Sequence, residues 1–282
     1  MRFEINYTSE YRYDTQVAGN HNRLRMRPTS AGTQRLEHFD VRIEPFGLRN
    51  EYLDLFGNHV VELLVAEPHQ ELSISVDALV ATTEPLPPPR ATWQDLKADD
   101  YRWAAGIYRF DPWPPGGTPD LSDLIEATRG DTPAETAEKI MGSIPARYAY
   151  RPGVTTVDSG LFDLLNFGAG VCQDFANLAC ALLRRHGIAA RYVSGYYFTT
   201  PDADGVSAEV DTHAWVEALL PVAGNADHVW HGFDPTNAIV AGASHVKIGH
   251  GRVYRDVPPV EGAFTGTASS TVDAHVRMNR VG

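Results

Sequence analysis

Residues 168–198, GAGVCQDFANLACALLRRHGIAARYVSGYYF, are the stretch from which the rest of the chain can be interpreted. Apolar side chains recur there at helical spacing and basic residues precede Gly187, which predicts a helix with Cys172 in its first turn. The β-branched and aromatic run over residues 191–198 predicts a strand. Unpaired amides and the positive end of the helix dipole favour a thiolate at such a position. Since cysteine is also a common core residue, the interpretation depends on partners elsewhere in the chain.

Two later segments carry those partners. DTHAWVEALLP alternates as a strand that has His213 and Trp215 on one face, and HVWHGFDPTN is a second strand that ends at Asp234, before a proline. If the two strands are neighbours and antiparallel, His213 and Asp234 lie side by side. The carboxylate can then hold one imidazole tautomer while the other ring nitrogen faces the thiol of Cys172.

Other residues are candidates for rival or supporting roles. His231, three positions from Asp234, is a rival base, and Asp211 is a rival orienting group, although the strand geometry favours His213 and Asp234. The backbone N–H of Cys172 is expected to stabilise an oxyanion. Side-chain candidates for the same task are Gln173 and Asn166, and candidates for a substrate cleft are Trp215 and Asp174. Each of these residues also has a simpler interpretation, as a solvated, packing or helix-capping residue.

The three segments resemble a known family. GVCQDFANLACALLRRHGIAARYVSGY, THAWVEALLP and WHGFDPTN are similar to the motif blocks of the transglutaminase-like superfamily of cysteine enzymes, which has a papain-like core. The resemblance implies Cys172 as nucleophile, His213 as general base and acid, and Asp234 as orienting residue. YRYDTQVAGNHNRLRMRPTS and YLDLFGNHVVELLV resemble the N-terminal β domain of the bacterial members, and GHGRVYRDVPPVEGAF resembles the segment that follows the aspartate.

The domain organisation follows from pattern and turn signals. Short alternating runs separated by turns predict an N-terminal β-sandwich domain over residues 1–83, and the proline-rich residues 84–95 read as a semi-rigid linker. Residues 96–282 are expected to form an α+β, papain-like catalytic domain with a C-terminal extension, its nucleophile helix packed on an antiparallel sheet. TASSTVDAHVRM, from Thr267, alternates as a last strand that returns to the N-terminal domain.

Composition bounds the partners. The formal net charge of −12 argues against nucleic acid or an anionic membrane surface as a partner. No hydrophobic signal region and no apolar run of membrane length occurs, so we expect a cytoplasmic location without membrane association. Cys172 and Cys180 lie eight positions apart on one predicted helix, roughly 12 Å, and are therefore expected to be free thiols, Cys180 as a core residue.

No cofactor and no metal is expected, because histidines such as His21, His38, His59 and His69 are scattered without ligand spacing. The predicted function is thiol acyl transfer on peptide or isopeptide-type amides of a peptide or protein substrate. Water as second nucleophile makes a protease or amidase, which is the favoured interpretation, and an amine makes a transglutaminase. The alternatives are a non-catalytic peptide-binding or assembly module and a structural partner in a peptide-modification pathway. The sequence leaves the oligomeric state open.

Overall fold

The structure is a computed structural model that describes residues 1–112, 117, 119–199, 205–222 and 227–281. Its helices are α1 (Asp99–Ala105), α2 (Ser122–Thr128), α3 (Pro133–Arg147), α4 (Leu161–Phe167) and α5 (Cys172–Arg185), with 3₁₀ turns η1 (Asp95–Lys97), η2 (Gly106–Arg109) and η3 (Tyr254–Asp256). Its strands are β1 (Arg2–Leu24), β2 (Gln34–Glu44), β3 (Leu48–Leu53), β4 (His59–Val65), β5 (His69–Thr82), β6 (Ala149–Tyr150), β7 (Ala169–Gly170), β8 (Ala190–Tyr197), β9 (Ser207–Val210), β10 (Thr212–Pro221), β11 (His228–Asp234), β12 (Ile239–Val240), β13 (His245–Gly251), β14 (Val260–Thr265) and β15 (Ser270–Arg280).

The N-terminal part is one eight-stranded antiparallel sheet that curls around the long strand β1. The first half of β1 pairs with β5 and β15, and its last residues pair with β4 and β14. Gly19, with a φ of 55°, lies where the partners change, in a left-handed conformation that glycine adopts readily. Both halves contribute to one apolar core, so the predicted β-sandwich takes the form of a curled sheet.

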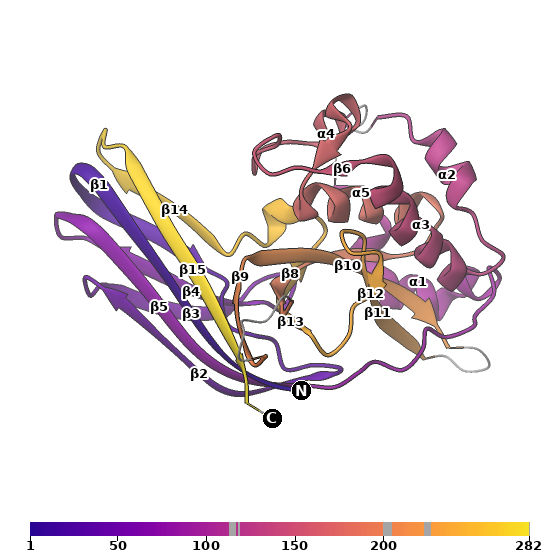
Figure 1. Ribbon diagram of the computed structural model, residues 1–282, viewed down its shortest axis with the longest axis horizontal. Coiled ribbons are helices and arrows are strands. Elements are labelled where there is room, and N and C mark those ends of the chain that lie inside the picture. The colour runs from indigo at the N-terminus through magenta and orange to yellow at the C-terminus, as the bar shows by residue number, and fades with distance from the viewer. Residues whose placement is uncertain (113–116, 118, 200–204, 223–226, 282) are drawn as a thin grey trace.

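The last strand of the chain returns to this sheet, which confirms the prediction for the C-terminal segment. β15 runs antiparallel to β1 from the pair Phe3–Arg280 to the pair Tyr13–Ser270. The two chain ends consequently lie next to each other (Figure 1). Since β9 and β14 also join, the curled sheet draws strands from well beyond the first 83 residues.

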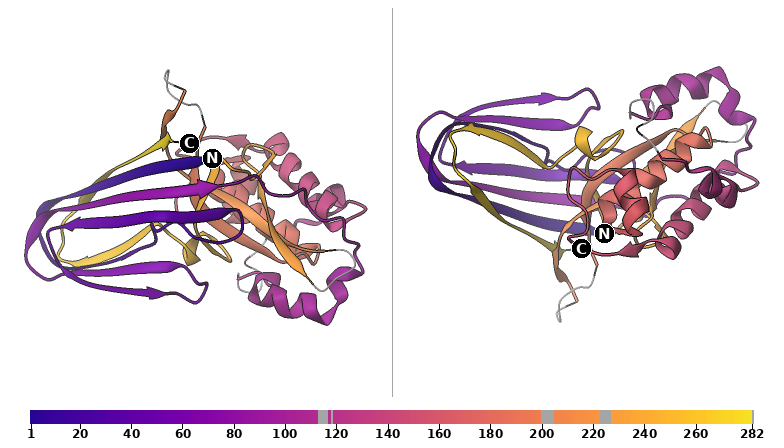
Figure 2. Two further views of the ribbon diagram at one scale, coloured as in Figure 1. Left: turned by 90° about the horizontal axis from the view of Figure 1, so that it is seen from below. Right: turned by 90° about the horizontal axis from the view of Figure 1, so that it is seen from above.

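The second part is a five-stranded antiparallel sheet in the order β12-β11-β10-β8-β13, with α5 packed on one face. The predicted α+β core is therefore present. Figure 2 shows the helices gathered on the side away from the long strands of the curled sheet. The side chains of α5 are buried from Asp174 to Arg184, and Cys180 lies among them as a free, fully buried thiol. This packing fixes the start of α5 relative to β10.

The two sheets share an apolar contact. Phe198 at the end of β8 lies with its ring centre 5.1 Å from that of Phe3 in β1, and Val246 and Ile248 of β13 join the same cluster. Residues 84–92 of the predicted linker form neither helix nor strand. Within the part of the chain that the structure describes, no helix combines the length and apolarity needed to cross a membrane.

Candidate active site

Helix α5 begins at Cys172, which is half-buried. The segment before it is held by the short parallel pairing of β6 with β7. The Asp174 carboxylate accepts the backbone N–H of Val171 at 2.8 Å and the hydroxyl of Thr155 at 2.6 Å, so it caps the helix start. A Cβ at Gly170 would lie 2.7 Å from that carboxylate, which is why glycine is needed there. These contacts place the thiol in the first turn, as predicted.

Asp174 does not belong to a cleft wall, and this corrects one expectation. Its residue exposure is 2%, and its side chain faces back under the first turn of α5. Burial raises its pKa above the ordinary value for a carboxyl group, although the hydrogen bonds from Thr155 and Val171 oppose the rise. The simpler interpretation, a residue that stabilises the helix N-terminus, is the one that the geometry supports.

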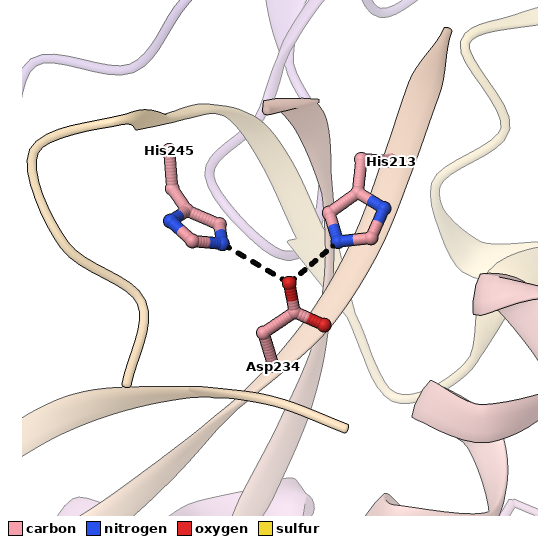
Figure 3. A group of neighbouring side chains, drawn as sticks. All are labelled: His213, Asp234 and His245. Atoms are coloured by element: carbon pink, nitrogen blue, oxygen red, sulfur yellow. Dashed lines mark hydrogen bonds and ion pairs between the residues drawn. The ribbon is translucent and has the colours of Figure 1, made fainter. Parts of the chain in front are cut away.

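His213 and Asp234 meet between neighbouring strands. β10 and β11 pair antiparallel as far as the pair Val216–Phe233, and Asp234 is the next residue of β11. From there its Oδ2 accepts a hydrogen bond from His213 Nε2 at 2.8 Å (Figure 3). Because Nε2 is engaged, Nδ1 is the ring nitrogen left for the thiol, and Cys172 is the second side-chain hydrogen-bond partner of this imidazole.

The electrostatics of His213 follow from these two partners. Burial by itself would lower the pKa of the imidazole, but the hydrogen bonds to Asp234 and Cys172 and the charges of both groups outweigh it and raise the pKa to about 9. The side chain is 12% exposed, so screening by water is weak. These two partners therefore favour the protonated form of His213.

Asp234 is fully buried and receives donors on both oxygens. Oδ1 accepts the backbone N–H groups of Thr236 at 2.9 Å and Asn237 at 3.2 Å, because the chain turns directly after β11. Oδ2 accepts His213 and also the side-chain amide of Asn237 at 2.7 Å. Burial alone would raise the pKa of this carboxyl, yet its hydrogen bonds hold the pKa well below the usual range. Asp234 is therefore a fixed anion.

A second histidine completes the surroundings of Asp234. His245, the first residue of β13, lies with Nε2 at 3.2 Å from Oδ2, on the side opposite His213 (Figure 3). Its Nδ1 accepts the backbone N–H of Gly242 at 3.2 Å, so the proton of the neutral ring is on Nε2, which donates to Asp234. The ring is buried and stacks on Tyr197, with centres 4.4 Å apart. His245 thus fixes the carboxylate without changing its charge.

The remaining candidates are placed away from the thiol or behind it. Trp215 is buried, with its ring 6.2 Å from that of His213 and nearly parallel to it, and acts as a backing wall. Gln173 directs its amide to the carbonyls of residues 156 and 157, at 3.4 and 3.5 Å. Asn166 is exposed on α4, and no hydrogen bond between the described residues joins it to Cys172. In this structure, therefore, neither side-chain amide points toward the region beside the Cys172 thiol where a substrate oxyanion would form.

The rival residues lie outside this arrangement. His231 is three residues from Asp234 on β11, so its side chain leaves the opposite face of the strand, where it is buried and packs against Phe233. Burial lowers its pKa below that of an ordinary histidine. Asp211 is exposed and precedes β10. Of the predicted groups, the structure brings together Cys172, His213 and Asp234.

The same group of side chains also has the composition of a metal site. His213, Asp234 and His245 each offer one ligand atom, and these atoms lie within 4.8 Å of one another. Both imidazoles, however, bond the same carboxylate oxygen, so an ion at this position would replace the bond that orients His213. The arrangement is complete as a hydrogen-bond network.

Two members of the network, Asn237 and His245, have no counterpart in the sequence interpretation. Asn237 lies in the turn after Pro235, where Asp-Pro-Thr-Asn is a signal for a tight turn whose side chains bond locally. His245 is eleven residues from Asp234, on a strand at the far edge of the sheet from β12. β10 and β8 lie between β11 and β13, so His245 comes close through the segment before β13, where the Ala241 N–H donates to the Gly232 carbonyl of β11 at 3.0 Å.

Comparisons with known proteins identify the family of the chain. Residues 3–81 match the bacterial transglutaminase-like N-terminal region, and residues 123–235 match the transglutaminase-like superfamily. An uncharacterized protein of Mycobacterium tuberculosis is 31% identical over 295 residues, covering 98% of this chain and 91% of that protein. An uncharacterized protein of Mycobacterium leprae is 32% identical over 291 residues, covering 99% of each.

A solved structure has the same fold along nearly the whole chain. A candidate cysteine protease from Cytophaga hutchinsonii superposes with a TM-score of 0.75 at 25% identity, covering 99% of this chain and 90% of that one. Fold, motifs and relatives thus lead to the same family: the chain belongs to the transglutaminase-like superfamily, and it carries the N-terminal region found in bacterial members.

Proposed function

We propose that the protein is a thiol acyl-transfer enzyme that acts on peptide or isopeptide-type amides. In this proposal Cys172 is the nucleophile, His213 the general base and acid, and Asp234 the orienting group. The observation that carries it is the position of His213, which hydrogen-bonds the buried Asp234 through Nε2 and has Cys172 as its other side-chain partner. The superfamily core supports the same class of chemistry.

The first half of the reaction breaks the amide. His213 takes the thiol proton of Cys172 at Nδ1, and the thiolate sulfur forms a bond to the carbonyl carbon while the C=O π pair moves to the oxygen. The resulting oxyanion is stabilised by the Cys172 N–H at the start of α5. His213 then donates its Nδ1 proton to the leaving nitrogen, and the C–N bond breaks. The product amine departs, and a thioester on Cys172 remains. A raised pKa at His213 keeps this proton available at neutral pH.

The second half releases the acyl group. His213, now neutral, takes a proton from a second nucleophile, which attacks the thioester carbon while the C–S bond breaks. With water the product is a carboxylic acid, and with an amine it is a new amide. We propose hydrolysis as the main outcome, because the structural relative from Cytophaga hutchinsonii is a candidate cysteine protease.

The test uses substrates whose products identify the second nucleophile. The protein is incubated with a mixture of casein peptides, with and without monodansylcadaverine, and the products are analysed by mass spectrometry. We expect new peptide termini with the native protein and with Cys180→Ser, since Cys180 is fully buried and burial raises its pKa to about 11. Cys172→Ala should abolish both cleavage and amine incorporation.

Two results would contradict the proposal. Cleavage that persists in Cys172→Ala would exclude Cys172 as the nucleophile. If the native protein neither cleaves peptides nor incorporates the amine, yet retains peptides in a pull-down, the protein is a binding module that keeps the family fold without turnover.

A further inference from the structure

A large cavity lies behind the candidate active site, between the core sheet and the N-terminal part of the chain. Its volume is about 980 Å³, the size that small organic ligands occupy in proteins. One wall is the sheet face of β8, β10, β11 and β13, and the others are residues 27–34 and the proline-rich linker. Neither Cys172 nor His213 lines it, but Trp215, which contacts His213, and His245, which bonds Asp234, both do. The cavity therefore adjoins the candidate active site without containing the thiol.

The wall formed by the sheet carries three charged side chains that converge on one atom. Arg191 and Glu217 are directly paired across β8 and β10, and the Arg191 Nε bonds Glu217 Oε2. Lys247 Nζ lies 2.6 Å from the same oxygen. The three side chains are 15%, 14% and 13% exposed, respectively. Two buried cations thus share a single carboxylate oxygen.

The cavity as a whole has a surplus of positive charge. Among its lining residues Arg27, Arg191 and Lys247 are cations and Glu217 is the one carboxylate, whereas the chain carries a formal net charge of −12. Burial lowers the pKa of Lys247 to about 8, with Glu217 opposing the shift, so the ammonium remains charged at neutral pH. Burying two cations against one anion is costly unless another anion approaches them.

The other surfaces of the cavity are largely apolar or aromatic. Trp215 and Trp230 stand on the same sheet wall, and the Arg191 guanidinium lies 4.1 Å from the centre of the Trp230 ring. Leu36, Leu86 and linker prolines face them from the N-terminal part. A ligand that matches both surfaces has an anionic group at one end and an apolar or aromatic body.

We propose that this cavity binds a small organic carboxylate, with the acid group toward Arg191 and Lys247 and the apolar body between Trp230 and the linker. The ligand is bound, not converted, and the acid group is held by Arg191 and Lys247, which take no part in the thiol chemistry proposed for Cys172. Glu217 weakens ligand binding, because its carboxylate competes with the ligand for the two cations.

The experiment uses a matched pair of probes, 1-naphthylacetate and its uncharged amide, 1-naphthaleneacetamide, titrated into the full chain by isothermal calorimetry. We expect the carboxylate to bind about tenfold more tightly than the amide. Lys247→Met should weaken carboxylate binding about fivefold to tenfold, and Glu217→Gln should strengthen it, while neither changes amide binding. Lys139→Met, the same exchange at an exposed position of α3, is the control and should have no effect.

Opposite signs for Lys247→Met and Glu217→Gln are the decisive result, and circular dichroism establishes that each variant is folded. If Glu217→Gln does not fold, Lys247→Met and the acid–amide difference still decide the matter. Equal binding of acid and amide, absence of binding by both, or carboxylate binding that is unchanged in Lys247→Met would overturn the proposal.

Discussion

Two buried carboxylates on one face of the core sheet have opposite kinds of partner. Asp234 receives imidazole, amide and backbone N–H donors, and among them His213 has a pKa raised to about 9. Glu217 is paired with the permanent guanidinium of Arg191 and with Lys247. His213 and Glu217 are four residues apart on β10, roughly 13 Å.

The difference teaches how one sheet can hold two unlike sites. An imidazole beside a fixed anion can take up and release a proton, which is what acyl transfer requires. Beside Glu217, the Arg191 guanidinium keeps its charge throughout, and Lys247, whose pKa burial lowers to about 8, keeps its charge at neutral pH, so the pair sets a positive potential there. One histidine beside each carboxylate reflects this difference. Asp234 and Cys172 raise the pKa of His213 to about 9, whereas burial, Lys247 and Arg191 lower the pKa of His250, near Glu217, to about 2.

The largest expected effect is therefore in the titration of these two histidines. At pH 5 to 7, NMR of ¹⁵N-labelled protein should find His213 protonated on both nitrogens and His250 neutral, with His213 losing its proton near pH 9. Because the folded-state pKa of His213 lies above the unfolded value of about 6.5, its pairing stabilises the fold fully below that pH and ceases to do so as the pH rises through about 9. Similar midpoints for the two rings would contradict the comparison.

The second largest effect is on the reactivity of Cys172, which should depend on Asp234 and not on Glu217. Asp234→Asn should lower the rate of Cys172 alkylation by iodoacetamide at pH 7 roughly tenfold to hundredfold, because the amide cannot stabilise the imidazolium. Glu217→Gln, the equivalent exchange at the other end of the sheet face, should leave that rate within about twofold. Intact-mass spectrometry in a Cys180→Ser background measures both rates. Equal losses in the two variants would mean that general destabilisation, and not orientation of His213, is being measured.

A smaller effect tests His245 as a positioning residue. His245→Leu removes one donor from Asp234, so alkylation of Cys172 should slow about fivefold, and His245→Gln, which keeps a donor, should restore part of the rate. Loss of the donor leaves the carboxylate more basic, and the NMR midpoint of His213 should move to higher pH. A slower rate with an unchanged midpoint would give His245 a packing role alone.

Much of the fold could be predicted because its signals are local. The helix at Cys172, the strand that ends at Asp234 and the returning C-terminal strand each follow from periodicity, capping or a proline within the segment itself. The order cysteine, histidine, aspartate, together with the motif resemblance, was enough to predict which side chains meet.

The remainder depends on tertiary contacts of connecting segments and on bulges, which leave no local signal. β10 and β8 separate β13 from β11 in the sheet, and His245 reaches Asp234 because the segment before β13 is tied to β11 by the hydrogen bond from the Ala241 N–H to the Gly232 carbonyl. Similarly, a register shift between Lys247 and Gly249 brings Lys247 and His250 to the same face although they are three residues apart. The charged cluster and the cavity beside it were therefore not visible in the sequence.

The most direct test of the central claim, that His213 activates Cys172, is the pH dependence of Cys172 alkylation. Iodoacetamide reacts with the native protein and with His213→Ala, each in a Cys180→Ser background, and intact mass gives the rate from pH 5 to 10. We predict rapid alkylation of the native protein well below pH 8 and, in His213→Ala, the profile of an ordinary thiol, rising near pH 8.5. Identical profiles, or a Cys172 that is inert in both proteins, would contradict the account.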